Sequence, residues 1–127
     1  MVQVYTLTHH DKWEEDRSAT TTPRVTPAHV TFNLPDVSGT STVDYQMTYL
    51  PDGNASFIYT ETVVVANFDG KKGSFITQGK GTWNGKEHKA EGTFEIVEGS
   101  GTDELKGIKG TGVQESSPYG YRFDVTF

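Results

Sequence analysis

Glu61 is the carboxylate in this 127-residue chain whose position most strongly suggests chemistry. It lies in the run Ala55–Phe68, where side chains alternate between two faces if the run forms a β-strand. Glu61 then shares a face with the apolar and aromatic side chains of Phe57, Tyr59, Val63 and Val65. If that face is interior, Glu61 must be hydrogen-bonded, paired or protonated, because burying a bare charge is very costly. Desolvation would raise its pKa toward neutrality, which suits a general acid or base. The alternative is a structural glutamate held by tyrosine hydroxyls, a threonine or a lysine.

Aromatic and polar side chains in neighbouring runs complete the candidate site. We predict that Glu61 and Tyr49 are catalytic, because a tyrosine in a cavity can donate a hydrogen bond to a carbonyl while its ring packs against hydrocarbon. We predict that the substrate contacts Tyr45, Met47, Phe57, Tyr59, Phe75, Gln78, Trp83 and Phe94. The alternative is that such tyrosines are core residues with satisfied hydroxyls. One bulge reverses the alternation, so the sequence leaves open which face of each strand lines the cavity.

Two other motifs contain residue types that can bind metal ions or phosphate. His9 and His10 are adjacent, so in a strand they point to opposite faces and cannot both bind one metal ion. One of them could lie at a barrel mouth, with surface placement as the alternative. The segment Gly99-Ser100-Gly101-Thr102 lacks the following helix that phosphate binding requires, so it predicts a tight turn. The sequence therefore predicts no metal and no cofactor.

Composition narrows the classes of partner. The length fits one domain over residues 1–127. The net charge is −6 and the chain has no basic stripe, so nucleic acid and anionic membranes are poor partners. The absence of cysteine excludes a disulfide scaffold and a thiolate nucleophile. The longest apolar run, Val63–Ala66, is far shorter than a membrane span, and the N-terminus lacks a signal-peptide pattern. We expect a cytoplasmic protein, and the sequence leaves homo-oligomer formation open.

The periodicity predicts an all-β fold with hardly any helix. Tight turns at Asp52-Gly53 and Asp69-Gly70 join alternating runs, as in β-hairpins. A long connection is expected over Ser18–Pro27, which is rich in threonine and proline. About eight antiparallel strands in a meander favour closure into a barrel whose interior holds side chains or one small ligand. The expected strands are Val2–Trp13, Ala28–Leu34, Thr40–Tyr49, Ala55–Phe68, Gly73–Gly81, Lys86–Val97, Leu105–Gln114 and Tyr119–Phe127.

Several spaced motifs resemble a known family. They include Gly39-Thr40-Ser41-Thr42-Val43-x-Tyr45-x-Met47-x-Tyr49, Asp69-Gly70-Lys71-Lys72-Gly73-Ser74-Phe75 and Gly99-Ser100-Gly101-Thr102-x-Glu104-Leu105-x-Gly107-Ile108-x-Gly110-Thr111-Gly112. These motifs cover most of the chain and resemble the small proteins grouped as domain of unknown function 3224. That family is similar in fold to the allene oxide cyclase barrel, which has eight antiparallel strands and binds an apolar molecule in its interior. Some Diels–Alderases that close spirotetronate rings use a similar barrel.

The resemblance implies a barrel and an interior ligand but assigns no reaction. The allene oxide cyclase interior uses a glutamate and a cysteine, and because this chain has no cysteine, only the glutamate role carries over, by placement, to Glu61. Three hypotheses follow. The protein is a cofactor-free cyclase or isomerase of secondary metabolism, or it carries a small apolar organic ligand unchanged, or it is a structural barrel filled by its own aromatic side chains.

Overall fold

The computed structural model describes residues 1–127 as one antiparallel β-sheet of nine strands in the order β1-β9-β8-β7-β6-β5-β4-β3-β2. The all-β antiparallel prediction is therefore confirmed. Two short 3-10 helices, η1 (Pro35–Val37) and η2 (Asp103–Leu105), lie in connections, and neither has the length or apolarity needed to cross a membrane. The strands are β1 (Val2–Leu7), β2 (His9–Glu15), β3 (Arg24–Leu34), β4 (Gly39–Tyr49), β5 (Ala55–Phe68), β6 (Lys71–Asn84), β7 (Lys89–Ile96), β8 (Lys109–Ser116) and β9 (Tyr119–Thr126).

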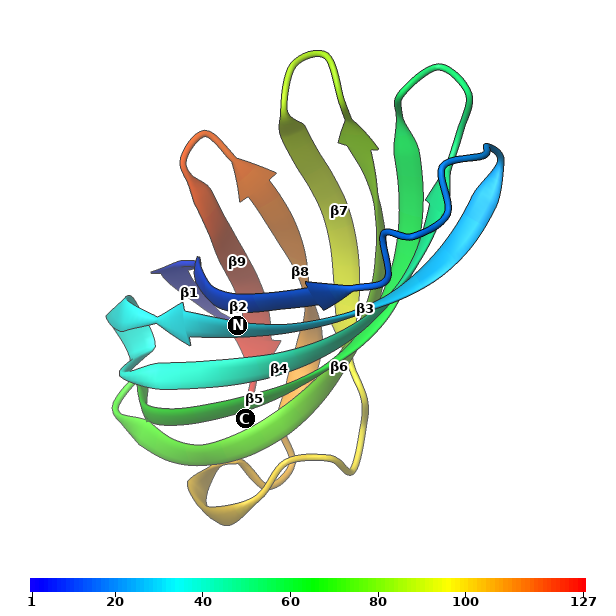
Figure 1. The fold of residues 1–127 in the computed structure, drawn as a ribbon. Helices are drawn as coiled ribbons and strands as arrows, with labels where there is room; N and C mark the ends of the chain where they lie inside the picture. The colour runs from blue at the N-terminus through cyan, green and yellow to red at the C-terminus, as the bar shows by residue number, and fades with distance from the viewer.

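The sheet is strongly curled, and its two edge strands are consecutive in the chain (Figure 1). β1 pairs with β9 and β2 pairs with β3, with Thr8 between the two strands. The single strand predicted over Val2–Trp13 is therefore wrong, because the chain changes its pairing partner at Thr8. This break raises the number of strands from the expected eight to nine, in one curled sheet whose edges are β1 and β2. Closure into a barrel stays a prediction. A register shift between His10 and Lys12 adds a bulge to β2.

β3 begins earlier than the sequence predicts. The sequence predicts a connection over residues 24–27, but Arg24 pairs with Tyr49 and Pro27 with Gln46 on β4. β2 pairs with β3 only from Ala28 onward, so Pro27 lies where β3 has no partner on its other side. A proline without an N–H group is tolerated at such an edge position.

The inner face of the curled sheet is filled by a continuous aromatic core. Phe123 on β9 lies 5.2 Å from Phe68, 5.8 Å from Phe75 and 5.1 Å from Phe94, measured between ring centroids. The contacts are edge-to-face, the arrangement that aromatic rings prefer. Phe68, Phe75 and Phe123 are all buried. The alternation of the long strands therefore separates an apolar inner face from a polar outer face, as the sequence predicts.

Removing one ring from this core should cost much of the protein's stability. We expect Phe123→Ala to lower the free energy of unfolding by about 3–5 kcal/mol, because it removes buried surface and leaves a cavity. The matched control is Ile58→Ala on the outer face, where the side chain is 56% exposed, and it should change the free energy of unfolding by less than about 0.5 kcal/mol. Urea denaturation measures both. Equal losses in the two variants would contradict the assignment of inner and outer faces.

Candidate functional site

Glu61 lies on β5 and is the only carboxylate in the buried core. Its side chain is held from two sides. The Ser41 hydroxyl of β4 donates a hydrogen bond of 2.5 Å to Oε2, and the Tyr121 hydroxyl of β9 donates to Oε1 at 3.0 Å and Oε2 at 3.2 Å. β9 and β5 are separated in the sheet by three strands, so the Tyr121 bond crosses the interior. Glu61 therefore links strands that lie far apart in the sheet order.

Burial controls the protonation of Glu61. With only 1% of the residue exposed, desolvation raises the pKa of Glu61 to about 7, against the opposing effect of the hydrogen bonds from Ser41 and Tyr121. Near neutral pH the carboxyl group is therefore present in both its protonated and its ionised form. A group with this pKa can accept a proton and return it without a large energetic cost in either direction.

Three tyrosines surround this carboxyl group. Tyr45 on β4 and Tyr59 on β5 pack with ring centroids 5.3 Å apart, and Tyr121 approaches from β9. Burial, and then the charge of Glu61, raises the pKa of all three hydroxyls, so they stay protonated and act as hydrogen-bond donors. The Tyr59 hydroxyl is buried and bonds to no other group of the protein. The site thus combines one acid–base group with several fixed donors.

The structure places most of the predicted contact residues on the inner face. Buried there with Glu61 are Tyr45, Met47, Phe57, Tyr59, Phe75 and Phe94, while Trp83 is partly buried against the core. The prediction that Gln78 faces the interior is wrong, because Gln78 is exposed on the outer face. Gln78 and Phe75 are separated by three positions on β6, and a regular strand sends residues at odd spacing to opposite faces.

Tyr49 is not next to Glu61. Tyr49 pairs with Ala55 near one end of the β4–β5 hairpin, and Glu61 pairs with Val43 six residues further along β4, so about 20 Å of strand separates the two positions. The Tyr49 hydroxyl instead donates a 2.5 Å hydrogen bond to Glu15. The structure therefore does not bring the two predicted catalytic residues together.

Glu15 is the centre of a second polar cluster, at the end of β2. Its Oε2 accepts hydrogen bonds from the hydroxyls of Tyr49 at 2.5 Å and Thr26 at 2.7 Å, and its Oε1 accepts one from the Trp13 indole at 3.0 Å. Burial opposes ionisation of Glu15, but these bonds outweigh it and lower the pKa of the carboxyl group. Burial and Glu15 together raise the pKa of Tyr49 to about 12. Glu15 therefore fastens β2 to β3 and β4.

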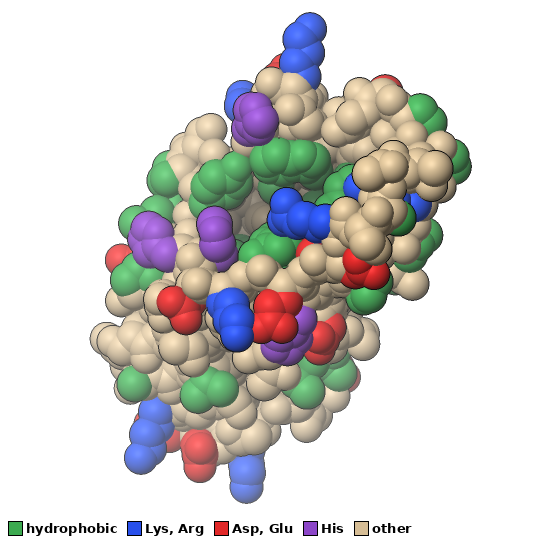
Figure 2. All heavy atoms as spheres, viewed as in Figure 1, with side chains coloured by type: hydrophobic (Ala, Val, Ile, Leu, Met, Phe, Trp, Pro, Cys, Tyr) green, Lys and Arg blue, Asp and Glu red, His purple; other side chains and the backbone are tan.

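β2 covers Tyr45 through the side chain of Trp13. Its Trp13 ring stacks on Tyr45 with centroids 5.7 Å apart and an interplanar angle of 22°. Most of β2 is exposed, including His9 and His10, and the strand crosses the open side of the curled sheet (Figure 1). A hollow bordered by hydrophobic side chains opens on the same face of the molecule (Figure 2). β2 is thus an edge strand that pairs with β3 alone, and the Glu15 cluster and the Trp13 ring add side-chain contacts that hold it in place.

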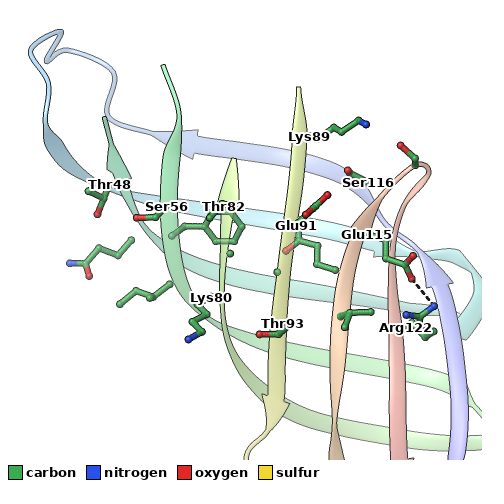
Figure 3. A pocket seen from close by; sticks show the side chains of 18 residues that line it. Thr48, Ser56, Lys80, Thr82, Lys89, Glu91, Thr93, Glu115, Ser116 and Arg122 are labelled. Atoms are coloured by element: carbon green, nitrogen blue, oxygen red, sulfur yellow. Dashed lines mark ion pairs between the residues drawn. The ribbon is translucent and has the colours of Figure 1, made fainter. Parts of the chain in front are cut away.

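A separate hollow of about 1010 Å³ lies on the outer face of the sheet (Figure 3). Its walls carry hydroxyl and charged side chains, and Arg122 forms a 3.3 Å ion pair with Glu115 across part of it. The labelled lining residues include Thr48, Ser56, Lys80, Thr82, Glu91 and Thr93. These are outer-face positions, so this hollow is not the interior cavity expected from the sequence.

Sequence reasoning missed three side chains of these two polar clusters: Ser41, Tyr121 and Glu15. The alternation places Ser41 and Tyr121 on the apolar faces of their runs, which is a usable signal for inward orientation. Their contact with Glu61 depends on the curl of the sheet, which brings β9 opposite β5, and no local pattern encodes that distance. Glu15 lies beyond the end of the predicted first strand, in a segment without apolar alternation.

The fold and its inner cluster define a small all-β protein built on one curled antiparallel sheet. The family model described as Protein of unknown function (DUF3224) matches residues 6–126, so the chain belongs to this family, as its motifs predict. No curated protein gives a significant match. The similarity of the fold to the allene oxide cyclase barrel stays a prediction.

The raised pKa of Glu61 should make stability depend on pH. Below pH 4.5 Glu61 is protonated in both the folded and the unfolded chain. As the pH rises from 4.5 to about 7, the unfolded chain ionises while the folded one does not, so folding loses free energy across this window. The loss is about 3 kcal/mol, at roughly 1.36 kcal/mol per pKa unit.

Glu61→Gln removes this titration and leaves every other group in place. Urea denaturation of both proteins between about pH 4 and pH 8 should show the stability of the original protein falling relative to Glu61→Gln as the pH rises. Parallel stability curves for the two proteins would show that Glu61 titrates normally.

The Glu15 cluster should control how tightly β2 is held. We expect Tyr49→Phe to speed amide hydrogen exchange in β2 by about tenfold, because it removes a hydrogen bond to a buried charged group. The control is Tyr119→Phe, which removes the hydrogen bond to the His88 carbonyl and should leave β2 unchanged. Unaltered exchange in β2 of Tyr49→Phe would mean that another contact holds this strand.

Proposed function

We propose that the interior of the curled sheet binds a small apolar molecule and that Glu61 moves a proton on it, making the protein a cofactor-free isomerase or cyclase of secondary metabolism. The observation that carries this proposal is Glu61 itself, a fully buried carboxyl group whose pKa of about 7 matches the working range of an acid–base catalyst. A carboxyl group with only a structural role has no use for a raised pKa. The burial that raises the pKa also costs folding free energy when the group is ionised.

In this proposal the β1–β2 segment serves as one bent strand, and the curled sheet encloses the ligand as an eight-stranded barrel does. The ionised carboxyl group of Glu61 takes a proton from a carbon of the substrate, and the resulting carboxylic acid returns it to another carbon. Ser41 and Tyr121 hold the carboxyl group in position through their hydrogen bonds. The surrounding side chains exclude water and fix the conformation of the substrate, and no further reagent is consumed.

The ligand reaches this site when β2 moves away. Trp13 covers Tyr45, and β2 pairs on one side only, with β3. Apolar side chains then contact the ligand, among them Tyr45, Met47, Phe57 and Trp83, which lie between Glu61 and the hairpin ends of the sheet. β2 is therefore the movable part of the wall around the binding site.

The aromatic packing of the interior favours a second candidate function, a structural barrel. Phe68, Phe75, Tyr121 and Phe123 are each no more than 2% exposed and already fill the part of the interior beyond Glu61. This packing is what a structural barrel filled by its own aromatic side chains requires. Under that reading Glu61 is a buried structural group, and no ligand binds.

Glu61→Gln separates these readings because it keeps the shape of the side chain and removes its charge. Ligands are first found by thermal-shift screening of apolar unsaturated and cyclic compounds, located inside the sheet by NMR, and then followed by mass spectrometry for conversion. For a catalyst, Glu61→Gln should lower turnover by about 10²- to 10⁴-fold with little change in affinity. For a carrier, the ligand is returned unchanged by both proteins and only affinity shifts.

The control for this experiment is Glu91→Gln, which changes an exposed outer-face carboxylate and should leave turnover and binding unchanged. Full turnover in a folded Glu61→Gln protein would contradict the acid–base role. A screen in which no compound binds the interior would support the self-filled structural barrel.

A further inference from the structure

Tyr59 carries an unpaired hydrogen-bond donor inside the protein. The residue is 4% exposed, and its hydroxyl makes no hydrogen bond to any group of the chain. Only two other buried side-chain atoms lack a partner, Arg24 Nε and Gln114 Oε1. Tyr59 is the one that lies two positions from Glu61 on the same face of β5. The unpaired donor therefore belongs to the immediate surroundings of the candidate acid–base group.

This hydroxyl contributes no hydrogen bond to the fold. A buried polar group without a partner costs stability, and phenylalanine would supply the same ring without that cost. The ring of Tyr59 already packs against Tyr45 and Phe57, with centroids 5.3 Å and 6.1 Å away. Tyr121 is the opposite case, because its hydroxyl is paired with Glu61. Groups that break a local folding rule without compensation are concentrated at functional sites.

The donor and the carboxyl group project from the same face of β5, and the tip of the Tyr59 ring lies against Gly79 of the adjacent strand β6. Residues two positions apart on a strand have Cα atoms about 7 Å apart and side chains that project from the same face. A ligand on this face whose carbonyl oxygen accepts a hydrogen bond from Tyr59 can have its adjoining carbon atoms beside Glu61. The Tyr59 hydroxyl remains protonated, so it can donate throughout the reaction.

We infer that the substrates are apolar ketones or aldehydes with a removable proton beside the carbonyl group, and that Tyr59 donates a hydrogen bond to the carbonyl oxygen. This inference rests on the proposed function of Glu61. The Glu61 carboxylate takes the proton from the adjacent carbon, the C–H electron pair becomes a C=C bond, and the C=O π electrons move to the oxygen. The resulting enolate oxygen accepts the hydrogen bond of Tyr59, which strengthens as negative charge develops.

The second half of the reaction restores the carbonyl group. The oxygen electrons re-form C=O, and when the enolate is conjugated with a further double bond, the carbon at its far end takes the proton back from Glu61. The double bond has then moved into conjugation with the carbonyl group. Substrate and product have the same atoms and the same oxidation state, so no oxidant, reductant or cofactor is required.

The experiment uses two matched pairs of probes that differ only in the acceptor oxygen: 2-acetylnaphthalene with 2-isopropenylnaphthalene, and 2-decanone with 2-methyl-1-decene. The full-length protein should bind each ketone about five- to tenfold more tightly than its alkene partner. Tyr59→Phe should remove that preference without weakening alkene binding. The infrared carbonyl stretch of the bound ketone should lie at lower frequency in the original protein than in Tyr59→Phe. The control variant is Tyr5→Phe, at an exposed tyrosine on β1, which should behave as the original protein.

A stability measurement completes the test. Tyr59→Phe should melt at the same temperature as the original protein or higher, whereas Tyr121→Phe should melt lower, because only Tyr121 loses a hydrogen bond. A lower melting temperature for Tyr59→Phe would show that its hydroxyl is paired within the fold and would overturn the inference. Equal affinity for ketone and alkene, with an unshifted carbonyl stretch, would overturn it while leaving the proposed function standing. If no probe binds, the proposed function fails together with the inference.

Discussion

The burial of the Glu61 carboxyl group is the constraint on which the rest of this structure depends. Its ionised form is costly in the apolar interior, so the fold supplies Ser41 and Tyr121 as donors from strands on either side of the space. The Tyr121 bond joins β9 to β5 across the interior and so requires the sheet to curl. The same carboxyl group has a pKa of about 7, so it can both take up and release a proton near neutral pH. Structure and proposed chemistry therefore depend on one side chain.

The two polar clusters of the interior differ in kind. Glu15 accepts three short hydrogen bonds and has a lowered pKa, which marks a stably ionised group that fastens an edge strand. Glu61 has a raised pKa and lies beside Tyr59, whose hydroxyl has no partner in the chain. Glu15 fastens β2 to the sheet, and Glu61 is the group to which we assign proton transfer in the proposed function. The two pKa values move in opposite directions because desolvation dominates at Glu61, whereas hydrogen bonds outweigh it at Glu15.

Much of the fold follows from the sequence because strands encode their faces locally. The alternation in Ala55–Phe68 and Thr40–Tyr49 correctly placed Glu61, Tyr45 and Met47 on the inner face, and Asp-Gly turns located the hairpins. Gln78 lies on the outer face because it is three positions from the inward-facing Phe75 on a regular strand. The break at Thr8 and the early start of β3 at Arg24 depend on which strand each residue pairs with, and pairing is a tertiary property. The contact between Glu61 and Tyr121, 60 residues apart, has no local signal at all.

The most direct test of this account is the protonation of Glu61, followed through the carbon-13 chemical shift of its side-chain carboxyl group as the pH is changed. The account predicts a midpoint near pH 7, because burial raises the pKa of Glu61 to about 7. Tyr121→Phe should move the midpoint higher, since it removes a hydrogen bond that favours the ionised form. A midpoint near 4.5, the ordinary value for glutamate, would show that water reaches the carboxyl group and would contradict the buried acid–base site.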